Sequence, residues 1–554
     1  MDSYVTRFWS LHALAAMLML TLLAFAHPSP PTSITRPTAT IDSGVVIGAT
    51  TMLPEAKTEV DKFLGIPYSS PTGRWALPHE VDAWHKPLNA SAIGPICVQA
   101  WNYNALGPDE NDMKALFDQD PPEESEDCLT VNIFAPSSPG PPHRKGRAVV
   151  VFIHGGGFQL GGSNLYDCSA FTAYEDIVAV TFNYRTNIFG FPASPAIPLK
   201  QRNLGLLDQL FALDWVRRNI HAFGGDPALV TVCGVSSGAE SIDAHMLTHG
   251  SPSKPKPPFR GAILESGLSS LGFLSFRPPD NNLANWNRML QATNCSSTSD
   301  KSALDCLSRV AASTLKTIME ANRIDFPPIT DNVTVPASPG AIRPTGNFAK
   351  VPVLIGTVAE EGRSLINHNI SMQDFKHAFL NDALFPNGTA DAIVASYPRT
   401  AEMTGFDVGA AIFTDFLYQC PTAMLSYQTI DNGVSTWRYY LNVSLPAFLP
   451  AQLTWLRKYH GVEYYLLFTN PEDKRHTLQT RGLAGFMRSA FARFVKDPVG
   501  GPGWSPAGTG GVAVLGDVAG SKTSGGTVVS EKALDEKCPL FQGVLDGMAG
   551  LPIS

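Results

Sequence analysis

The chain has few charged residues and no basic cluster. Asp, Glu, Lys and Arg make up only 16% of the 554 residues, and the formal net charge is −8. Proteins that bind nucleic acid neutralise phosphates with clustered Lys and Arg, so this composition argues against a nucleic-acid partner. The eight cysteines have no zinc-site spacing, and we expect no metal or cofactor. Beyond residue 26, no apolar run is long enough to cross a bilayer.

The first 26 residues have the pattern of a secretory signal peptide. Arg7 precedes a continuous apolar run at 11–26, and Ala24-Phe25-Ala26 offers a small-residue cleavage site. The alternative is an uncleaved membrane anchor, but the run is short for a span and ends on small residues. We therefore predict a signal peptide over 1–26, a secreted protein, and a mature chain of one domain over 27–554.

Two further features agree with secretion. Six N-x-S/T sequons mark possible glycosylation sites, at Asn89, Asn294, Asn332, Asn369, Asn387 and Asn442. The even number of cysteines suggests disulfides in an oxidising compartment, although spacing alone leaves their pairing open.

Buried strands alternate with helices along the chain. Continuous apolar runs, typical of strands covered on both faces, predict strands at 148–153, 177–182, 230–233, 261–264, 351–356 and 436–441. Helical spacing of apolar residues predicts helices at 203–219, 239–247 and 484–496. This alternation indicates an α/β fold, with a large and mostly parallel sheet flanked by helices.

Three other segments are expected to be less regular. The start of the domain should contain a hairpin-like pair of strands at 41–47 and 60–66, and the Gly-rich stretch 499–530 should lack regular structure. Residues 97–128 form a long loop that mixes aromatic, apolar and acidic residues. Such a loop is either functional or a solvated surface excursion.

The stretch around Ser236 is typical of a nucleophile elbow. A short apolar strand at 230–233 leads into Gly234-Val235-Ser236-Ser237-Gly238, and a helical pattern follows. The serine of an elbow sits on a tight strand-to-helix turn, and glycines on either side allow the chain segments to approach. The pentapeptide is weak evidence alone, so its partners must be found elsewhere in the chain.

A glycine triplet follows the predicted strand 148–153. In His154-Gly155-Gly156-Gly157-Phe158, the backbone N–H groups can converge on an anion. A lone triplet is more often a flexible turn, but its place before an elbow favours an oxyanion loop. We predict an oxyanion hole from the N–H groups of Gly156, Gly157 and Ser237.

An activated serine needs a histidine base and an acid, which follow it in that fold in the order acid, then histidine. Among the histidines after Ser236, His460 has a late loop position beside a glycine, whereas His476 lies in a charged stretch that predicts a solvated surface. Glu360 and Glu361 both follow the strand 351–356. We favour Glu361 as the acid, with Glu360 as the alternative.

These residues lie within motifs that resemble the type-B carboxylesterase/lipase family, which includes cholinesterases and secreted fungal lipases. The resemblance covers almost the whole mature chain and rests on segments 63–68, 126–133, 183–185, 190–191, 203–209 and 223–238. It implies an α/β-hydrolase fold, with Ser236 as nucleophile, Glu361 as acid and His460 as base. The implied activity is hydrolysis of carboxylic esters through an acyl-enzyme.

The resemblance also implies a disulfide framework. The expected pairs are Cys97–Cys128, Cys295–Cys306 and Cys420–Cys538, which leave Cys168 and Cys233 free. The first pair would close residues 97–128 into a flap, with an Arg74–Glu126 ion pair at its base and a possible contact with lipid interfaces.

A departure from the cholinesterase pattern narrows the expected class of substrate. Cholinesterases carry an acid before the nucleophile, where this chain has Val235, and the flap has no clear match to their choline-binding tryptophan, although Trp101 is nearby. A cationic choline ester is therefore not expected. A small-molecule carboxylic ester is the leading substrate class, triacylglycerol lipase activity is the alternative, and a non-catalytic adhesion or binding protein is a remote third.

Overall fold

The computed structural model describes residues 36–103, 106–117, 121–138, 146–250, 255–269, 276–386, 388–398, 400–468, 473–516 and 525–548. The described residues from Thr38 onward belong to one compact unit. The predicted signal peptide and the sequon at Asn387 lie outside the described residues.

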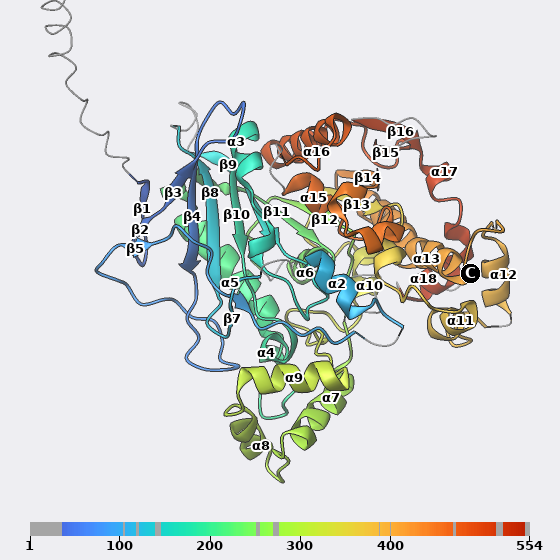
Figure 1. Cartoon of the computed structure of the whole chain (residues 1–554), viewed down its shortest axis with the longest axis horizontal. Coiled ribbons are helices and arrows are strands. Elements are labelled where there is room, and N and C mark those ends of the chain that lie inside the picture. The colour runs from blue at the N-terminus through green and yellow to red at the C-terminus, as the bar shows by residue number, and fades with distance from the viewer. Residues whose placement is uncertain are drawn as a thin grey trace, which may run out of the picture. The chain divides into compact units, whose positions relative to one another are not determined.

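A large mixed sheet forms the centre of this unit (Figure 1). Its order is β16-β15-β14-β13-β12-β11-β9-β10-β8-β4-β3. The strands from β10 to β15 pair in parallel, and antiparallel pairs occur only at the two sides. The strand bounds are β3 (Ala49–Thr51), β4 (Val60–Pro67), β8 (Thr130–Pro136), β9 (Arg147–Ile153), β10 (Val178–Phe182), β11 (Gly225–Val235), β12 (Gly261–Glu265), β13 (Val353–Val358), β14 (Thr436–Asn442), β15 (Gly511–Gly516) and β16 (Gly526–Ser530).

Each face of the sheet has its own apolar core. In β9, Val149 and Val151 belong to one core, while Val150 and Phe152 belong to the other. Side chains alternate between the faces of a strand, so a strand covered on both sides must be apolar throughout. This requirement explains the continuous apolar runs in the sequence.

Helices cover both faces. The first core includes residues of α5 (Leu204–Asn219), α6 (Ser237–Thr248) and α14 (Cys420–Asp431). The second includes residues of α3 (Ser169–Glu175), α15 (Glu463–Leu467) and α16 (Leu478–Lys496). The α/β-hydrolase arrangement, with a large mixed sheet between helices, is therefore present.

The other helices lie mainly beyond the sheet (Figure 1). Their bounds are α2 (Glu110–Phe117), α4 (Asn187–Gly190), α7 (Pro279–Ala292), α8 (Asp300–Leu307), α9 (Ala312–Asn322), α10 (Pro339–Ile342), α11 (Met372–Phe379), α12 (Thr389–Ala395), α13 (Gly405–Thr414), α17 (Glu531–Leu534) and α18 (Gln542–Met548). Within the described residues, no helix is both long enough and apolar enough to span a bilayer.

Two sequence predictions about strands are wrong. The segment 41–47 is not one strand paired with 60–66. Instead β1 (Thr38–Ile41) and β2 (Gly44–Ile47) pair with each other in a separate sheet that also contains β5 (Leu88–Asn89), while β4 pairs with β8. Asp42 and Ser43 form the turn, and Gly44 has φ 140°, which favours glycine.

The stretch 499–530 is also more regular than predicted. β15 and β16 form an antiparallel pair there, and β15 continues the parallel sheet beside β14. Both strands begin with glycine, which makes the short apolar run of β15 hard to recognise in the sequence. The residues of that run, from Val512 to Leu515, are buried. Neighbouring strands supply the pairing that the local sequence does not indicate.

The disulfides follow the pairing implied by the family resemblance. Cys97–Cys128, Cys295–Cys306 and Cys420–Cys538 are bonded. Cys168 and Cys233 are free and buried. The Arg74–Glu126 ion pair is present as well, with two short contacts of 2.7 and 2.5 Å between the guanidinium and the carboxylate.

Candidate active site

Ser236 lies at the tight turn between β11 and α6. Its backbone has φ 56° and ψ −126°, a conformation that non-glycine residues rarely adopt. The Ser236 N–H donates to the carbonyl of Glu265 at 2.8 Å, which ties the turn to β12. A Cβ at Gly238 would lie 2.1 Å from the carbonyl oxygen of Ile153, so only glycine fits there. The local geometry is that of a nucleophile elbow.

The glycine loop after β9 reaches the same turn. A Cβ on Gly155 would lie 3.0 Å from the Cβ of Ser236. Gly156 and Gly157 have φ 114° and 62°, and the carbonyl of Gly156 points back to accept from the Leu160 N–H at 3.1 Å. Among the described residues, the N–H groups of Gly156, Gly157 and Ser237 have no hydrogen-bond acceptor. They are thus available to an anion beside Ser236.

Glu361 and His460 are in direct contact. The Oε2 of Glu361 lies 2.6 Å from the Nδ1 of His460, and Oε1 accepts from the Val358 N–H at 2.7 Å. Glu361 is fully buried, so its two oxygens are fixed. Glu360 points elsewhere, accepting from the N–H of Lys458 at 3.2 Å. The adjacent carboxylates therefore have different partners, and only Glu361 orients the imidazole.

The environment of His460 favours its protonated form. Burial by itself lowers the pKa of His460, but the charge and hydrogen bond of Glu361, with smaller contributions from Glu463 and Glu240, raise it above the usual 6.5. The Nε2 of His460 is buried and has no hydrogen-bond partner among the described residues, Ser236 included. Catalytic hydrogen bonds are often long without substrate and tighten when it binds.

Two residues near His460 were not predicted from the sequence. The centroid of the Tyr418 ring lies 5.3 Å from the centroid of the His460 imidazole. Tyr418 belongs to a π-helical turn at Asp415–Gln419, and such turns are frequent at functional sites. Glu463 is buried, and its carboxylate accepts a hydrogen bond from the Oγ of Ser266 at 3.5 Å. Burial raises the pKa of Glu463. The short His-Gly-x-Glu spacing could have drawn attention to Glu463, but no sequence pattern indicates Tyr418.

The prediction for His476 is wrong. Its side chain is buried rather than solvated, and the centroid of its ring lies 4.6 Å from that of Phe448. Charged neighbours in sequence suggested a surface, but the aromatic partner lies 28 residues earlier in the chain.

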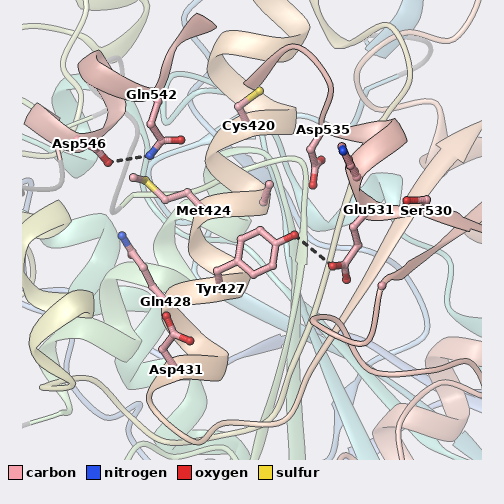
Figure 2. A pocket seen from close by; sticks show the side chains of 13 residues that line it. Cys420, Met424, Tyr427, Gln428, Asp431, Ser530, Glu531, Asp535, Gln542 and Asp546 are labelled. Atoms are coloured by element: carbon pink, nitrogen blue, oxygen red, sulfur yellow. Dashed lines mark hydrogen bonds between the residues drawn. The ribbon is translucent and has the colours of Figure 1, made fainter. Parts of the chain in front are cut away.

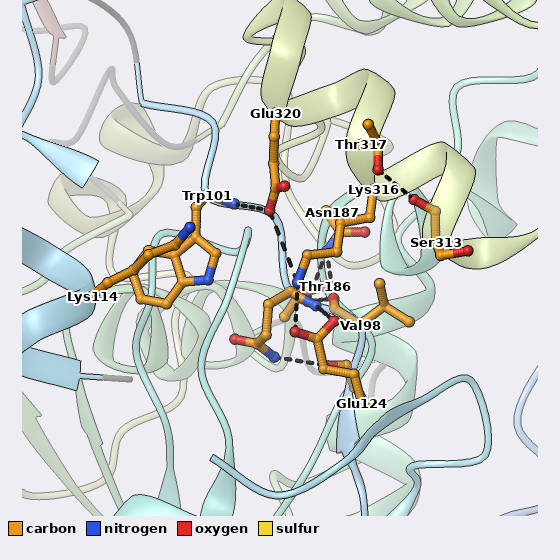
Figure 3. Close-up of polar contacts among 12 residues, drawn as sticks. Val98, Trp101, Lys114, Glu124, Thr186, Asn187, Ser313, Lys316, Thr317 and Glu320 are labelled. Atoms are coloured by element: carbon orange, nitrogen blue, oxygen red, sulfur yellow. Dashed lines mark hydrogen bonds and ion pairs between the residues drawn. The ribbon is translucent and has the colours of Figure 1, made fainter. Parts of the chain in front are cut away.

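Ion pairs and hydrogen bonds attach the flap to α9, as Figure 3 shows. Lys316 Nζ lies 2.5 Å from a carboxylate oxygen of Glu124, and Glu320 accepts from the Trp101 N–H at 3.1 Å. The indole of Trp101 is buried, and the Nζ of Lys114 lies over it, 5.7 Å from the ring centroid. The flap is thus held at both ends of its described part by one helix.

The flap helix α2 lies close to the candidate base. A Cβ on Gly461 would be 3.4 Å from the ring of Phe117, at the end of α2. Tyr465 donates to the carbonyl of Leu116 at 3.1 Å. The flap helix therefore contacts the residue that follows His460.

Comparisons with known proteins agree with this architecture. The model of the carboxylesterase family matches residues 35–508. The chain is 31% identical to the para-nitrobenzyl esterase of Bacillus subtilis (strain 168) over 470 residues, which are 79% of this chain and 86% of the relative. It is 31% identical to carboxylesterase 1E of Rattus norvegicus over 520 residues, or 87% and 90% of the two chains.

A solved structure of PNB esterase superposes with a TM-score of 0.72 at 29% identity, covering 92% of this chain and 99% of the other. The family match spans the strands from β1 to β14, the glycine loop, the elbow at Ser236 and the contact between Glu361 and His460. The chain belongs to the carboxylesterase family and is a carboxylic ester hydrolase.

Proposed function

We propose that the chain hydrolyses uncharged carboxylic esters through an acyl-enzyme on Ser236, with His460 as base and Glu361 as acid. The contact of 2.6 Å between Glu361 and His460 carries this proposal, because it fixes the imidazole with Nε2 free. Val235, in place of an acid before the nucleophile, leaves no carboxylate there to attract a choline ester.

The first half of the reaction forms the acyl-enzyme. Neutral His460 takes the proton from Ser236 as Oγ attacks the ester carbonyl carbon. The N–H groups of Gly156, Gly157 and Ser237 then donate to the developing oxyanion, and one such donor contributes about 2.7–4 kcal/mol to the barrier reduction. Glu361 stabilises the imidazolium, which protonates the departing alcohol as the tetrahedral intermediate collapses.

The second half uses water as the nucleophile. His460 removes a proton from water, which attacks the acyl carbon, and the Ser236 Oγ leaves with a proton from His460. The products are a carboxylic acid and the free enzyme, so the step needs no co-reactant besides water.

Triacylglycerol lipase activity is a second candidate. The observation that favours it is the position of α2, a flap helix with buried Met113 and Leu116, next to Gly461. A flap of this kind could present apolar residues to a lipid interface when it moves. Comparing hydrolysis of monomeric and emulsified esters of one chain length distinguishes the two activities, since only a lipase gains rate at the interface.

We further propose that the protein is secreted and glycosylated. The signal-peptide pattern at 1–26, the three disulfides and the sequons support this. Asn442 is half-buried and accepts from Lys458 at 2.7 Å, so glycans are proposed only at exposed sequons. These are Asn89, Asn294, Asn332 and Asn369.

Replacing the nucleophile tests the mechanism. Ser236→Ala should lower hydrolysis of a p-nitrophenyl ester by about 10⁶-fold while leaving the circular dichroism spectrum unchanged, because the covalent route is lost. A fluorophosphonate probe should label Ser236 in the unmodified protein, as identified by peptide mass spectrometry. Label on Ser237, or a fully active Ser236→Ala protein, would show that the assignment is wrong. A folded, unmodified protein without esterase activity would favour the non-catalytic alternative.

A further inference from the structure

The two loops that carry Glu361 and His460 are joined to each other by direct hydrogen bonds. We call residues 359–364, which follow β13, the acid loop, and residues 455–460, which precede α15, the base loop. The Glu360 N–H donates to the carbonyl of Lys458 at 3.0 Å, and the Lys458 N–H donates to the carboxylate of Glu360 at 3.2 Å. The contact between Glu361 and His460 therefore depends on how firmly the two loops are held together.

Arg363 connects the acid loop to the base loop and to α13. Its side chain is buried, its Nε donates to the carbonyl of Trp455 at 2.6 Å, and its Nη1 lies 2.9 Å from Oδ1 of Asp407. A planar guanidinium holds its acceptors in a fixed geometry. Within the described part of the chain, Arg363 makes no hydrogen bond to the side chain of Glu361 or His460. Any effect of Arg363 on the reaction must therefore act through the loops.

Asp407 gives Arg363 a rigid partner. The Oδ2 of Asp407 accepts from the N–H and the hydroxyl of Thr404 at 2.9 and 2.7 Å, in the capping box that begins α13. Burial by itself raises the pKa of Asp407, but the hydrogen bonds from Thr404 and the contact with Arg363 lower it to about 2. Asp407 is thus an anion at neutral pH that is fixed to a helix rather than to either loop.

The base loop contains a strained residue close to His460. Arg457 has φ 54° and ψ −102°, a combination outside the regions that non-glycine residues ordinarily occupy. Such a residue persists only where its surroundings hold it. The guanidinium of Arg457 contacts Asp407 at 3.1 Å and Glu360 at 3.5 Å. Asp407 therefore binds the acid loop through Arg363 and the strained turn of the base loop through Arg457.

We propose that Arg363 and Asp407 position the catalytic pair, an inference that rests on the roles proposed above for Glu361 and His460. Arg363 is the positioning residue that joins the acid loop to the base loop, and Asp407 anchors both loops to the start of α13. Together they hold the carboxylate of Glu361 against the Nδ1 of His460. Loss of either one loosens the loops, so that the imidazole is no longer held in one orientation.

Substitutions of opposite charge test this role. Arg363→Met and Asp407→Asn should each lower kcat for a p-nitrophenyl ester by about 10–100-fold, because misplacing a catalytic group by about 1 Å costs a factor of that order. KM should change by less than about threefold, since the reacting groups rather than the substrate are displaced. The double variant Arg363→Met/Asp407→Asn leaves no unpaired charge, so it should show the same loss of kcat even if a single variant does not fold.

The pH dependence of kcat/KM separates positioning from a direct effect of charge. His460 acts as a neutral base, so activity appears as the pH rises through its pKa, which Glu361 raises. Positioning predicts that this pKa falls by about 0.5 or more in both single variants, because the contact with Glu361 weakens. A direct charge effect predicts opposite shifts, since loss of Arg363 removes a positive charge and loss of Asp407 a negative one. The other titratable groups that face His460 are the same in both variants: Glu463 of α15, Glu240 of α6 and Tyr418 of the π-helical turn.

Arg147→Met is the matched control for Arg363→Met. Arg147 is also a buried guanidinium that joins a carboxylate to a backbone carbonyl, namely Asp176 at 2.6 Å and Ser138 at 3.0 Å. It begins β9, and the glycine loop follows the other end of that strand, so Arg147 lies far from Ser236. This variant should have a lower melting temperature, but its kcat and its pH profile should remain those of the unmodified protein.

Glu531→Gln is the matched control for Asp407→Asn. Like Asp407, Glu531 accepts from a hydroxyl and from a backbone N–H, here those of Tyr427 at 3.1 Å and Gly508 at 2.8 Å. Glu531 lines a cavity of about 590 Å³ between α14 and the C-terminal elements, and none of the proposed catalytic residues lines that cavity (Figure 2). Its substitution should also leave kcat and the pH profile unchanged.

Four results would overturn the proposal: unchanged kcat in the Arg363 and Asp407 variants, opposite shifts of the kinetic pKa, a loss of kcat that leaves this pKa in place, or equal losses in the matched controls. Ser236→Ala, measured in the same assay, distinguishes these results from failure of the proposed function. Full activity of Ser236→Ala contradicts the proposed mechanism itself. An inactive Ser236→Ala protein beside a normal Arg363→Met protein contradicts only the positioning role.

Discussion

At the residue scale, adjacent glutamates have unlike surroundings. Glu361 is fully buried against His460, whereas Glu360 lies near the surface with Lys458 and Arg457. A short helical turn at Glu361–Ser364 begins between them and directs the two side chains apart. The pair is a natural internal control, because the same substitution can be made at neighbouring positions.

Glu361→Gln should reduce kcat by about 10³–10⁴-fold, since a neutral amide can neither fix the required tautomer nor stabilise the imidazolium. Glu360→Gln should change kcat by less than about threefold, because its loss affects an exposed pair. Steady-state kinetics with a p-nitrophenyl ester measure both. Equal losses in the two variants would show that Glu361 has no special part in orienting His460.

At the element scale, the flap depends on α9. The Lys316–Glu124 pair and the Glu320 contact to the Trp101 N–H join segments that are far apart in sequence (Figure 3). The disulfide Cys97–Cys128 closes the flap at its base. If the flap opens, the covalent bond limits the extent of the movement, and loss of the ion pair should favour opening.

Lys316→Met should therefore increase opening of the flap without unfolding the molecule. A half-exposed ion pair contributes about 0.2–1 kcal/mol, which corresponds to at most about a fivefold change in the opening equilibrium. Hydrogen exchange of the amides in α2 should accelerate by that factor. Lys301→Met removes an exposed ion pair with Asp305 within α8, away from the flap, and exchange in α2 should stay the same. Equal acceleration in both variants would show that the Lys316–Glu124 ion pair does not hold the flap closed.

At the scale of the whole molecule, the Cys420–Cys538 disulfide joins the beginning of α14 to the C-terminal segment. It closes a loop with a sequence separation of 118, compared with 11 for Cys295–Cys306. Chain-entropy arguments give about 4.9 kcal/mol for the long loop and about 2.8 kcal/mol for the short one. The long-range bond should therefore matter more to the free energy of unfolding.

Urea unfolding in non-reducing buffer can compare the two bonds. The double variant Cys420→Ser/Cys538→Ser should lose about 2 kcal/mol more stability than Cys295→Ser/Cys306→Ser, because its unfolded chain gains more freedom. If the short-loop variant is the less stable, strain or local packing outweighs the entropy of the unfolded chain at these sites.

Much of the fold and site could be predicted from local patterns. Apolar runs located the parallel strands because both faces of each strand are covered, and Gly238 marked the elbow because no Cβ fits against Ile153. The glycine strands β15 and β16 were missed, since their order comes from pairing with neighbours. His476 was misplaced because its aromatic partner Phe448 is remote in sequence.

The sequence by itself determined the chemistry that we propose for this protein: a serine in a glycine turn, a glycine triplet after a strand, and a late histidine, in the order of the family. These features are local, so a linear pattern records them. Tertiary structure alone decided that Glu361 rather than Glu360 contacts His460, and that Tyr418 lies beside it. Such contacts depend on how distant segments pack, which no short stretch of sequence specifies.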